Sequence, residues 1–145
     1  MYATRAQMVD LFGEPALALL TDGPFVDGAQ AIADGPLDAA MRAAQAEVDG
    51  YLASVATLPL ARVPDPVRLH ACGIAYWYLD VDNPTDGATA RYRAAVRYLE
   101  RVQDGKAGLG LADDGQAVAT IGGADVDAPP RVFSDDRMGQ FTRGF

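Results

Sequence analysis

The chain has 145 residues, with 20 acidic and 12 basic side chains and a net charge of -8 at pH 7. Half of the residues are hydrophobic, but 27 of them are alanine, the best helix former. This excess of acidic residues argues against a protein that binds the nucleic-acid backbone. The single cysteine excludes an intrachain disulfide, and one cysteine with one histidine is too few for a four-ligand Cys/His zinc site. No apolar run approaches the roughly 20 residues that span a bilayer. We therefore expect an intracellular, mainly helical domain that uses no membrane, metal or cofactor.

The first predicted helix begins after Thr4, which forms a capping box with Gln7, and ends at Gly13. The apolar face of this helix is formed by Met8, Leu11 and Phe12. Residues 15–20 are expected to form a short apolar turn. Residues 23–36 contain three glycines and two prolines, and we interpret them mostly as loop.

The clearest helical pattern runs from Pro36 to about Val55, with Asp34 or Gly35 as the cap. Apolar residues recur in it at spacings of three and four, as expected for a helix with one buried face. This predicted buried face consists of Leu37, Met41, Ala44, Val48, Tyr51, Leu52 and Val55. The solvated face consists of Asp38, Arg42, Gln45 and Asp49.

A proline-rich connector, residues 58–66, separates this helix from the next one, for which Asp65 is the expected cap. Residues 67–81 are apolar almost all round, a pattern typical of a helix at the centre of a bundle or covered by a partner. The last long helix is expected over residues 85–104 and ends before Gly105.

Three arginines lie at intervals of four on the last helix and share one face: Arg93, Arg97 and Arg101. We favour a solvated stripe, assisted by Glu100, over a basic patch that faces a partner. The partner-facing interpretation stays open.

The character of the chain changes after Gly105. Residues 106–145 hold seven glycines and two prolines without a sustained helical period. Residues 117–121 followed by Gly122-Gly123 are compatible with a short β-hairpin in this long irregular extension. A disordered tail usually lacks aromatic residues, so three phenylalanines in the last 13 residues indicate docking, either back on the bundle or on a neighbouring chain. The candidate interface residues here are Arg131, Phe133, Arg137, Met138, Phe141, Arg143 and Phe145.

No set of catalytic residues emerges from the sequence. His70 and Cys72 are two residues apart on a predicted helix and cannot face each other, so we expect a buried structural thiol and a core or interface histidine. Gly105-Lys106 lacks the first glycine of a phosphate loop, and prolines interrupt both candidate calcium loops. These observations predict that the protein is not an enzyme.

Several short segments together resemble a Mu-like bacteriophage protein family, which is similar to the head–tail connector, or adaptor, proteins of tailed phages. Its most telling pieces are Glu47-Val48-Asp49-Gly50-Tyr51-Leu52 and Leu58-Pro59-Leu60. Further matching pieces are Tyr2-Ala3-Thr4, Leu11-Phe12-Gly13, Leu20-Thr21-Asp22, Val63-Pro64, Ala71-Cys72-Gly73-Ile74-Ala75-Tyr76, Arg91-Tyr92-Arg93, Gly105, Leu109-Gly110 and the ending from Phe133-Ser134 to Gly144-Phe145. The chain departs from the family pattern at Ala56-Thr57, where relatives commonly carry Arg-Tyr.

The resemblance implies a helical bundle that assembles as a ring of twelve beneath the portal, in the neck of the virion, after synthesis in the host cytoplasm. DNA would pass through the ring without sequence-specific binding. We expect residues 1–105 to form the bundle and residues 106–145 to dock on neighbouring subunits, the portal, or tail and neck proteins. The alternatives are a tail-terminator or other neck completion protein, and a small helical binding or regulatory protein with a groove around residues 76–78.

Overall fold

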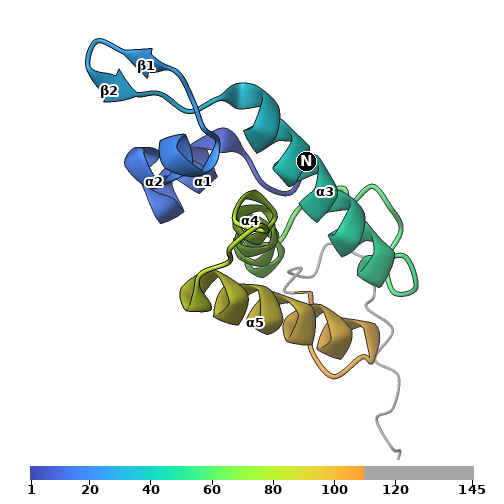
Figure 1. Ribbon diagram of the computed structural model, residues 1–145. Coiled ribbons are helices and arrows are strands. Elements are labelled where there is room, and N and C mark those ends of the chain that lie inside the picture. Colours follow the sequence, from blue (N-terminus) through green and yellow to red (C-terminus); the bar gives the residue numbers. More distant parts are fainter. Residues whose placement is uncertain (110–145) are drawn as a thin grey trace, which may run out of the picture.

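The computed structural model describes residues 1–109, which form five helices and a two-stranded sheet (Figure 1). Their bounds are α1 (Arg5–Phe12), α2 (Glu14–Leu20), β1 (Phe25–Val26), β2 (Ala29–Gln30), α3 (Asp34–Leu52), α4 (Asp65–Leu79) and α5 (Asp86–Gln103). The prediction of a mainly α fold is confirmed. The possible hairpin at residues 117–123 lies outside the described residues, and the division of the chain at residue 105 stays a prediction.

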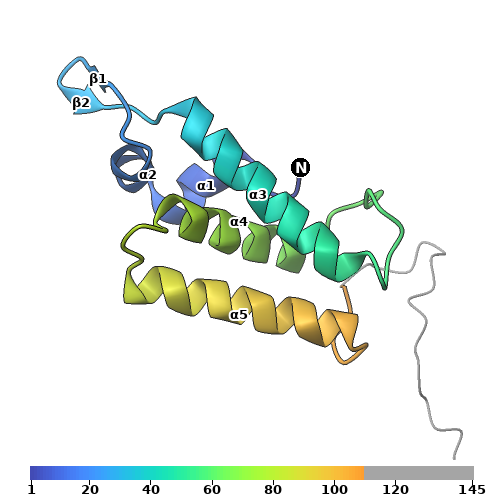
Figure 2. The same ribbon diagram turned by 45° about the vertical axis from the view of Figure 1, so that its right-hand side comes forward.

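The three long helices form the centre of the molecule, with α4 between α3 and α5 (Figures 1 and 2). Small residues on α4 are fully buried, among them Ala71 and Ala75, and let its neighbours approach closely. The apolar pattern of this helix correctly predicted its central position. None of the helices within residues 1–109 has the length and apolar character needed to cross a membrane.

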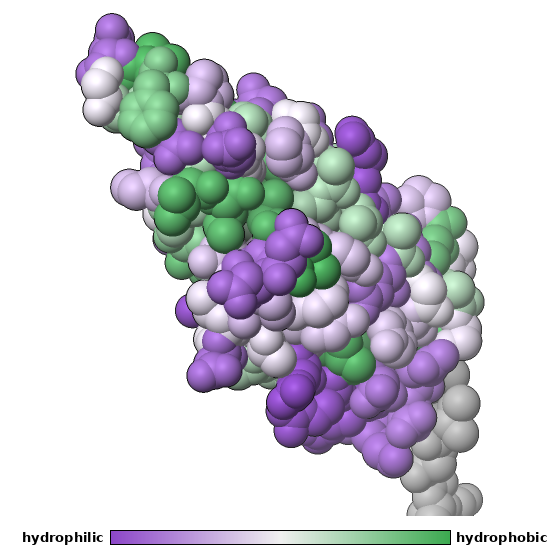
Figure 3. Space-filling model, viewed as in Figure 1, coloured by the Kyte–Doolittle hydropathy of each residue, from purple (hydrophilic) through white to green (hydrophobic). Residues whose placement is uncertain are grey.

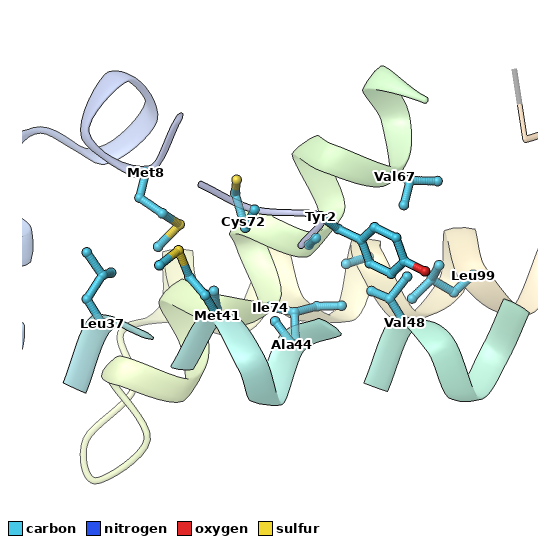
Figure 4. Packing of buried hydrophobic residues seen from close by; sticks show 14 of the residues in the cluster. Tyr2, Met8, Leu37, Met41, Ala44, Val48, Val67, Cys72, Ile74 and Leu99 are labelled. Carbon is cyan, nitrogen blue, oxygen red and sulfur yellow. The ribbon is translucent and has the colours of Figure 1, made fainter. Parts of the chain in front are cut away.

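The core lies where α3, α4 and the start of the chain meet, as Figure 4 shows for ten labelled side chains. Five members of the predicted face of α3 are buried: Leu37, Met41, Ala44, Val48 and Leu52. Tyr51 is half-buried and packs against the core. The prediction is wrong for Val55, because α3 ends at Leu52 and the Val55 side chain beyond it is 39% exposed.

The start of α1 follows the prediction closely. The Thr4 hydroxyl accepts a hydrogen bond from the backbone N–H of Gln7, and the Gln7 side chain accepts one from the backbone N–H of Thr4. Met8 is buried as expected. The predicted burial of Leu11 is wrong: its side chain is about half-exposed, because it lies beside a surface groove between α1 and α4.

The segment between α1 and α3 differs most from the prediction. Residues 14–20 form the helix α2 instead of a turn, and residues 25–30 form a hairpin instead of a loop. β1 and β2 pair in antiparallel fashion, with Asp27 and Gly28 at the turn and positive φ angles of 52° and 83°. Such angles match the two-residue turn that Asp-Gly favours, so the hairpin follows from a signal that the loop interpretation overlooked.

The hairpin projects from one end of the molecule (Figure 1), and its base is held by hydrogen bonds of the Thr21 side chain and by a close approach of two backbone segments. The hydroxyl of Thr21, a buried residue, donates to the Leu17 carbonyl and accepts a hydrogen bond from the Ala33 N–H at 3.0 Å. Gly23 passes so close to the Ala31 carbonyl that a Cβ atom would lie only 1.7 Å from its oxygen. These contacts fix the base of the arm, which we define as residues 23–31.

The ends of α4 and α5 lie within two residues of their predicted positions. Asp65 is in the first turn of α4 and is not its cap, since Pro64 occupies that position and makes no side-chain cap hydrogen bond. Thr85 caps α5 by accepting a hydrogen bond from the Ala88 N–H. Gly105, with a φ of 71°, ends the helix as predicted. The chain then turns back, and Leu109 is only 3% exposed against the bundle.

Candidate interaction surfaces

The arginine stripe, defined as Arg93, Arg97 and Arg101, lies on the exposed face of α5. Each step of four residues advances about 6 Å along a helix, so the three guanidinium groups follow one another along roughly 12 Å. Within residues 1–109, none of the three side chains forms an ion pair, and the only hydrogen bond among them joins the Arg97 Nε to the Arg93 carbonyl at 3.2 Å. The lower edge of Figure 3, where α5 runs, is strongly hydrophilic.

Basic charge is concentrated on α5 although the protein as a whole is acidic. Residues 86–106 hold five basic and three acidic side chains, whereas residues 1–79 hold four basic and nine acidic ones. Glu100 was expected to assist the stripe, but in the described part of the chain it makes no ion pair with an arginine. The stripe is therefore a locally basic surface on an acidic molecule.

Arg91 is next to the stripe in sequence but lies elsewhere in the structure. Its guanidinium is 5.6 Å from the centre of the Phe12 ring and 5.8 Å from that of Tyr76. These rings are themselves in contact, with centroids 4.3 Å apart. Cation–π contacts of this kind stabilise a fold, so Arg91 joins α5 to α1 and α4 and is not available to the stripe.

Glu47 on α3 accepts hydrogen bonds from two tyrosines on the neighbouring helices. Tyr92 donates at 2.8 Å and Tyr78 at 3.0 Å. Burial first, and then the hydrogen bond to the carboxylate, raise the pKa of both phenols above the ordinary value of 10. Both tyrosines therefore stay protonated donors at neutral pH. Trp77 stacks on the Tyr92 ring at 4.4 Å, so its indole is occupied by a contact within the chain.

A second carboxylate of the same sequence segment is engaged in the same way. Asp49 was expected on the solvated face of α3, but it accepts a hydrogen bond from the Tyr2 hydroxyl. Burial and this bond raise the pKa of Tyr2. The two acidic residues of Glu47-Val48-Asp49-Gly50-Tyr51-Leu52 thus hold tyrosines from other parts of the chain, and Val48 and Leu52 are buried in the core. The segment has a structural role in the fold.

His70 and Cys72 are separated, as their spacing predicted. His70 stacks on Tyr98 of α5 with ring centroids 4.4 Å apart, and burial lowers its pKa. Cys72 is a free thiol, only 1% exposed, and burial raises its pKa to about 11. A thiol that is protonated and inaccessible at neutral pH is a poor nucleophile. In the part of the chain that the structure describes, no three His, Cys, Asp or Glu side chains gather as a metal site.

The arm and α2 form an exposed apolar surface that the sequence interpretation missed. Phe25 is 77% exposed and Leu19 is 71% exposed, with Val26 close to half-exposed. Figure 3 shows apolar side chains along the arm and below it over the first two helices. An open cleft between α2 and the arm is lined by Pro15, Leu19 and Val26 among others. Aromatic and aliphatic side chains this exposed mark a candidate contact surface.

A shallow groove between α1 and α4 forms a second apolar surface. Leu11 and Leu69 are both about half-exposed on its walls, and Cys72 lies at its base. Asp65 and Arg68 border the groove and form an ion pair of 3.5 Å. The apolar pattern of residues 67–81 predicts a helix that is covered all round. Most of α4 fits this prediction, but Leu69 does not.

Seven of the predicted interface residues lie outside the described residues. They are Arg131, Phe133, Arg137, Met138, Phe141, Arg143 and Phe145. Their role in docking stays a prediction, whereas the arginines of α5 are placed together on one exposed face.

Comparisons with known proteins identify the family. The family model described as "Bacteriophage Mu, Gp36" matches residues 2–128. The chain is 36% identical over 141 residues to "Gene product J" of Escherichia phage Mu, covering 95% of this chain and 97% of that protein. It is 30% identical over 133 residues to "Mu-like prophage FluMu protein gp36" of Haemophilus influenzae, covering 92% of both chains. The chain therefore belongs to the bacteriophage Mu Gp36 family of Mu-like phage proteins.

Proposed function

We propose that this protein is a structural virion subunit, a head–tail connector that forms a ring between the portal and the tail of a tailed phage. The observation that carries the proposal is the exposed arm, with Phe25 on β1 and Leu19 of α2 beside it. Side chains of this size are rarely left exposed together on a monomer without a partner. The resemblance to head–tail connector proteins and the membership of a phage protein family support the same role.

The surfaces of the chain fit a ring better than a two-fold dimer. The arm and the α1–α4 groove are apolar, but they are different surfaces made by different elements. Contacts between unlike surfaces are head-to-tail and generate closed rings when the rotation closes. A ring of twelve is the size that the resemblance implies. Its place would be the neck of the virion, with synthesis in the host cytoplasm.

The chemistry of the described residues supports assembly over catalysis. The two carboxylates with tyrosine partners, Glu47 and Asp49, are committed to the fold, and Cys72 is buried with a raised pKa. A net charge of -8 would also suit a channel through which DNA slides, because an acidic wall does not retain the phosphate backbone. We propose that DNA passes without sequence-specific contacts.

The experiment is a mass measurement of the chain with the purified portal protein of the same phage. The proposal predicts a ring of this chain on the portal, and a variant that lacks residues 131–145 should keep its helical circular dichroism but lose the complex. No ring and no complex at any salt concentration would contradict the proposal. A complex with the purified tail but not with the portal would identify a tail-terminator instead.

A different class of function, a small binding or regulatory protein, would use the aromatic region around Trp77. Its indole already stacks on Tyr92, so a ligand there would have to disturb that stack. Ligand-dependent quenching of the fluorescence of Trp77, the single tryptophan, would favour this alternative over a connector.

A further inference from the structure

The cleft between α2 and the arm combines exposed aliphatic side chains with carboxylates. It has a volume of about 600 Å³, and Leu19 and Val26, which line it, are 71% and 53% exposed. Glu14 lines the same cleft, Asp27 lies at the turn of the arm, and Asp22 lies immediately before the arm. Long basic side chains fit such a site, because the apolar stem covers aliphatic residues while the charged head meets a carboxylate.

The sequence around the cleft carries only negative charge. Between Arg5 and Arg42 the chain holds six acidic residues and no lysine, arginine or histidine. All six are exposed, and within residues 1–109 only one of them, Asp34, forms an ion pair, with Arg5. The six are Asp10, Glu14, Asp22, Asp27, Asp34 and Asp38. A partner that covers this surface must therefore bring positive charge.

The arginine stripe supplies positive charge elsewhere on the same molecule. Its three side chains make no ion pair with any described residue, and exposed Ala90 and Ala94 leave space beside them. The stripe is about 12 Å long. The Cα atoms of Asp22 and Asp27 are at most about 17 Å apart, because an extended chain rises about 3.4 Å per residue. The acidic and the basic surface therefore have similar lengths.

The arm cannot reach the stripe of its own chain. In Figures 1 and 2 the arm and α5 lie on opposite sides of the molecule, with other helices between them. β2 packs on α2, whereas α5 packs on α3 and α4, and its buried residues lie on the side opposite the stripe. The hydrogen bonds of Thr21 and the close approach of Gly23 to Ala31 fix the base of the arm. A contact between the two surfaces therefore joins two separate copies.

We infer that the cleft between α2 and the arm is the docking site for the arginine stripe of a second copy of this chain. The arginine stems lie along Leu19 and Val26, and the guanidinium groups meet the carboxylates of Glu14, Asp22 and Asp27. The inference rests on the proposed assembly role and deepens it by naming a subunit contact. Each copy contacts one neighbour through its cleft and another through its stripe, and such head-to-tail contacts generate rings when the rotation closes.

The test is a charge swap in the full-length chain, followed by sedimentation velocity of the chain alone and with the purified portal protein. The stripe variant carries Arg93→Glu and Arg97→Glu. The cleft variant carries Glu14→Arg and Ala29→Arg, at exposed positions without a positive φ angle. Each variant alone should associate roughly tenfold or more weakly than the unaltered chain, because like charges then face each other. An equimolar mixture should regain association, since each stripe then meets a cleft of opposite charge on the other variant.

Matched controls separate this contact from net charge and from folding. Arg42→Glu with Arg62→Glu matches the charge change of the stripe variant at exposed arginines away from α5. Arginine in place of three exposed alanines along α3 and at its end matches the charge change of the cleft variant; these are Ala39, Ala46 and Ala53. Both controls should associate like the unaltered chain, and all variants should keep its circular dichroism spectrum.

Three results would overturn the inference while the proposed connector role survives. Association that neither variant weakens means that the cleft and the stripe lie outside the subunit contact. Association that the stripe variant weakens and the mixture does not restore means that the stripe binds another part of the chain, such as residues 110–145. Loss of retention on a DNA column by the stripe variant, with unchanged association, means that the occupant of the stripe is DNA.

A fourth result separates the inference from the function on which it rests. An unaltered chain that neither associates alone nor forms a ring on the portal overturns the proposed function and the inference together. A ring on the portal that depends on the cleft and the stripe, and that the mixture of variants restores, supports both.

Discussion

Tyr92 of α5 donates a 2.8 Å hydrogen bond to the carboxylate of Glu47 on α3, and so joins the two outer helices of the bundle directly. Tyr78 of α4 donates to the other oxygen of the same carboxylate. One acidic side chain thus connects all three long helices. The contact therefore helps to hold α3, α4 and α5 in their relative positions.

Replacement of Glu47 by alanine should destabilise the protein by about 2 kcal/mol, because two half-buried phenols lose a charged acceptor. The change should appear as a lower midpoint in urea or thermal unfolding followed by circular dichroism. Glu100→Ala removes an exposed carboxylate from α5 and serves as the control, with an expected change close to zero. Equal stability of the two variants would show that the tyrosine contacts contribute nothing.

Replacement of Gly23 by alanine should displace the arm, since the new methyl group would meet the Ala31 carbonyl. We expect a loss of about 2–4 kcal/mol in the free energy of unfolding, or a local rearrangement of residues 23–31 visible by NMR. Gly50→Ala is the control, because nothing lies near the added carbon on α3 and alanine favours the helix. A Gly23→Ala chain with unaltered spectra and stability would contradict the described base of the arm.

Replacement of Phe25 by serine should leave the stability of the monomer nearly unchanged, because the Phe25 side chain is 77% exposed. The same substitution should weaken assembly with the portal by roughly tenfold or more if the arm is a contact surface. Val81→Ser, at another exposed apolar position outside the arm, should have no effect on assembly. Assembly that tolerates Phe25→Ser as well as Val81→Ser would remove the arm from the interface.

Stability should depend on pH through His70. Burial lowers its pKa in the folded state, so the unfolded chain takes up a proton first as the pH falls below the ordinary value of 6.5. His70 therefore leaves the free energy of unfolding unaffected above pH 6.5. Below pH 6.5, the free energy of unfolding falls as the pH decreases. His70→Phe preserves an aromatic partner for Tyr98 and should flatten the dependence. The free energy of unfolding between pH 7.5 and pH 5.5, measured with urea, checks the difference.

The sequence predicted α1 and the three long helices because their apolar residues recur at regular spacing. Thr4 marks the start of α1, and Thr85 and Gly105 mark the ends of α5. It failed between residues 14 and 30, where α2 is too short to show a helical period and each strand has two residues. The exposure of Leu11 and Leu69 could not be predicted either, since it depends on how α1 crosses α4 and not on spacing within one helix.

The candidate surfaces were predicted only in part, because a local sequence pattern does not reveal contacts between residues that are distant in the chain. The arginine stripe follows from residues four apart on one helix, and its exposure is confirmed. The tyrosine partners of Glu47 come from residues 31 and 45 positions away, a separation that no local pattern reveals. Only the assembled fold brings these side chains together.

The central claim, that this chain is a ring subunit at the head–tail junction, is tested most directly by imaging the neck of purified phage particles by cryo-electron microscopy. The account predicts a ring of density between portal and tail into which α3, α4 and α5 of this chain fit, with subunit contacts at the arm. Density for this chain in the capsid shell or at the distal end of the tail, or its absence from the particle, would contradict the account.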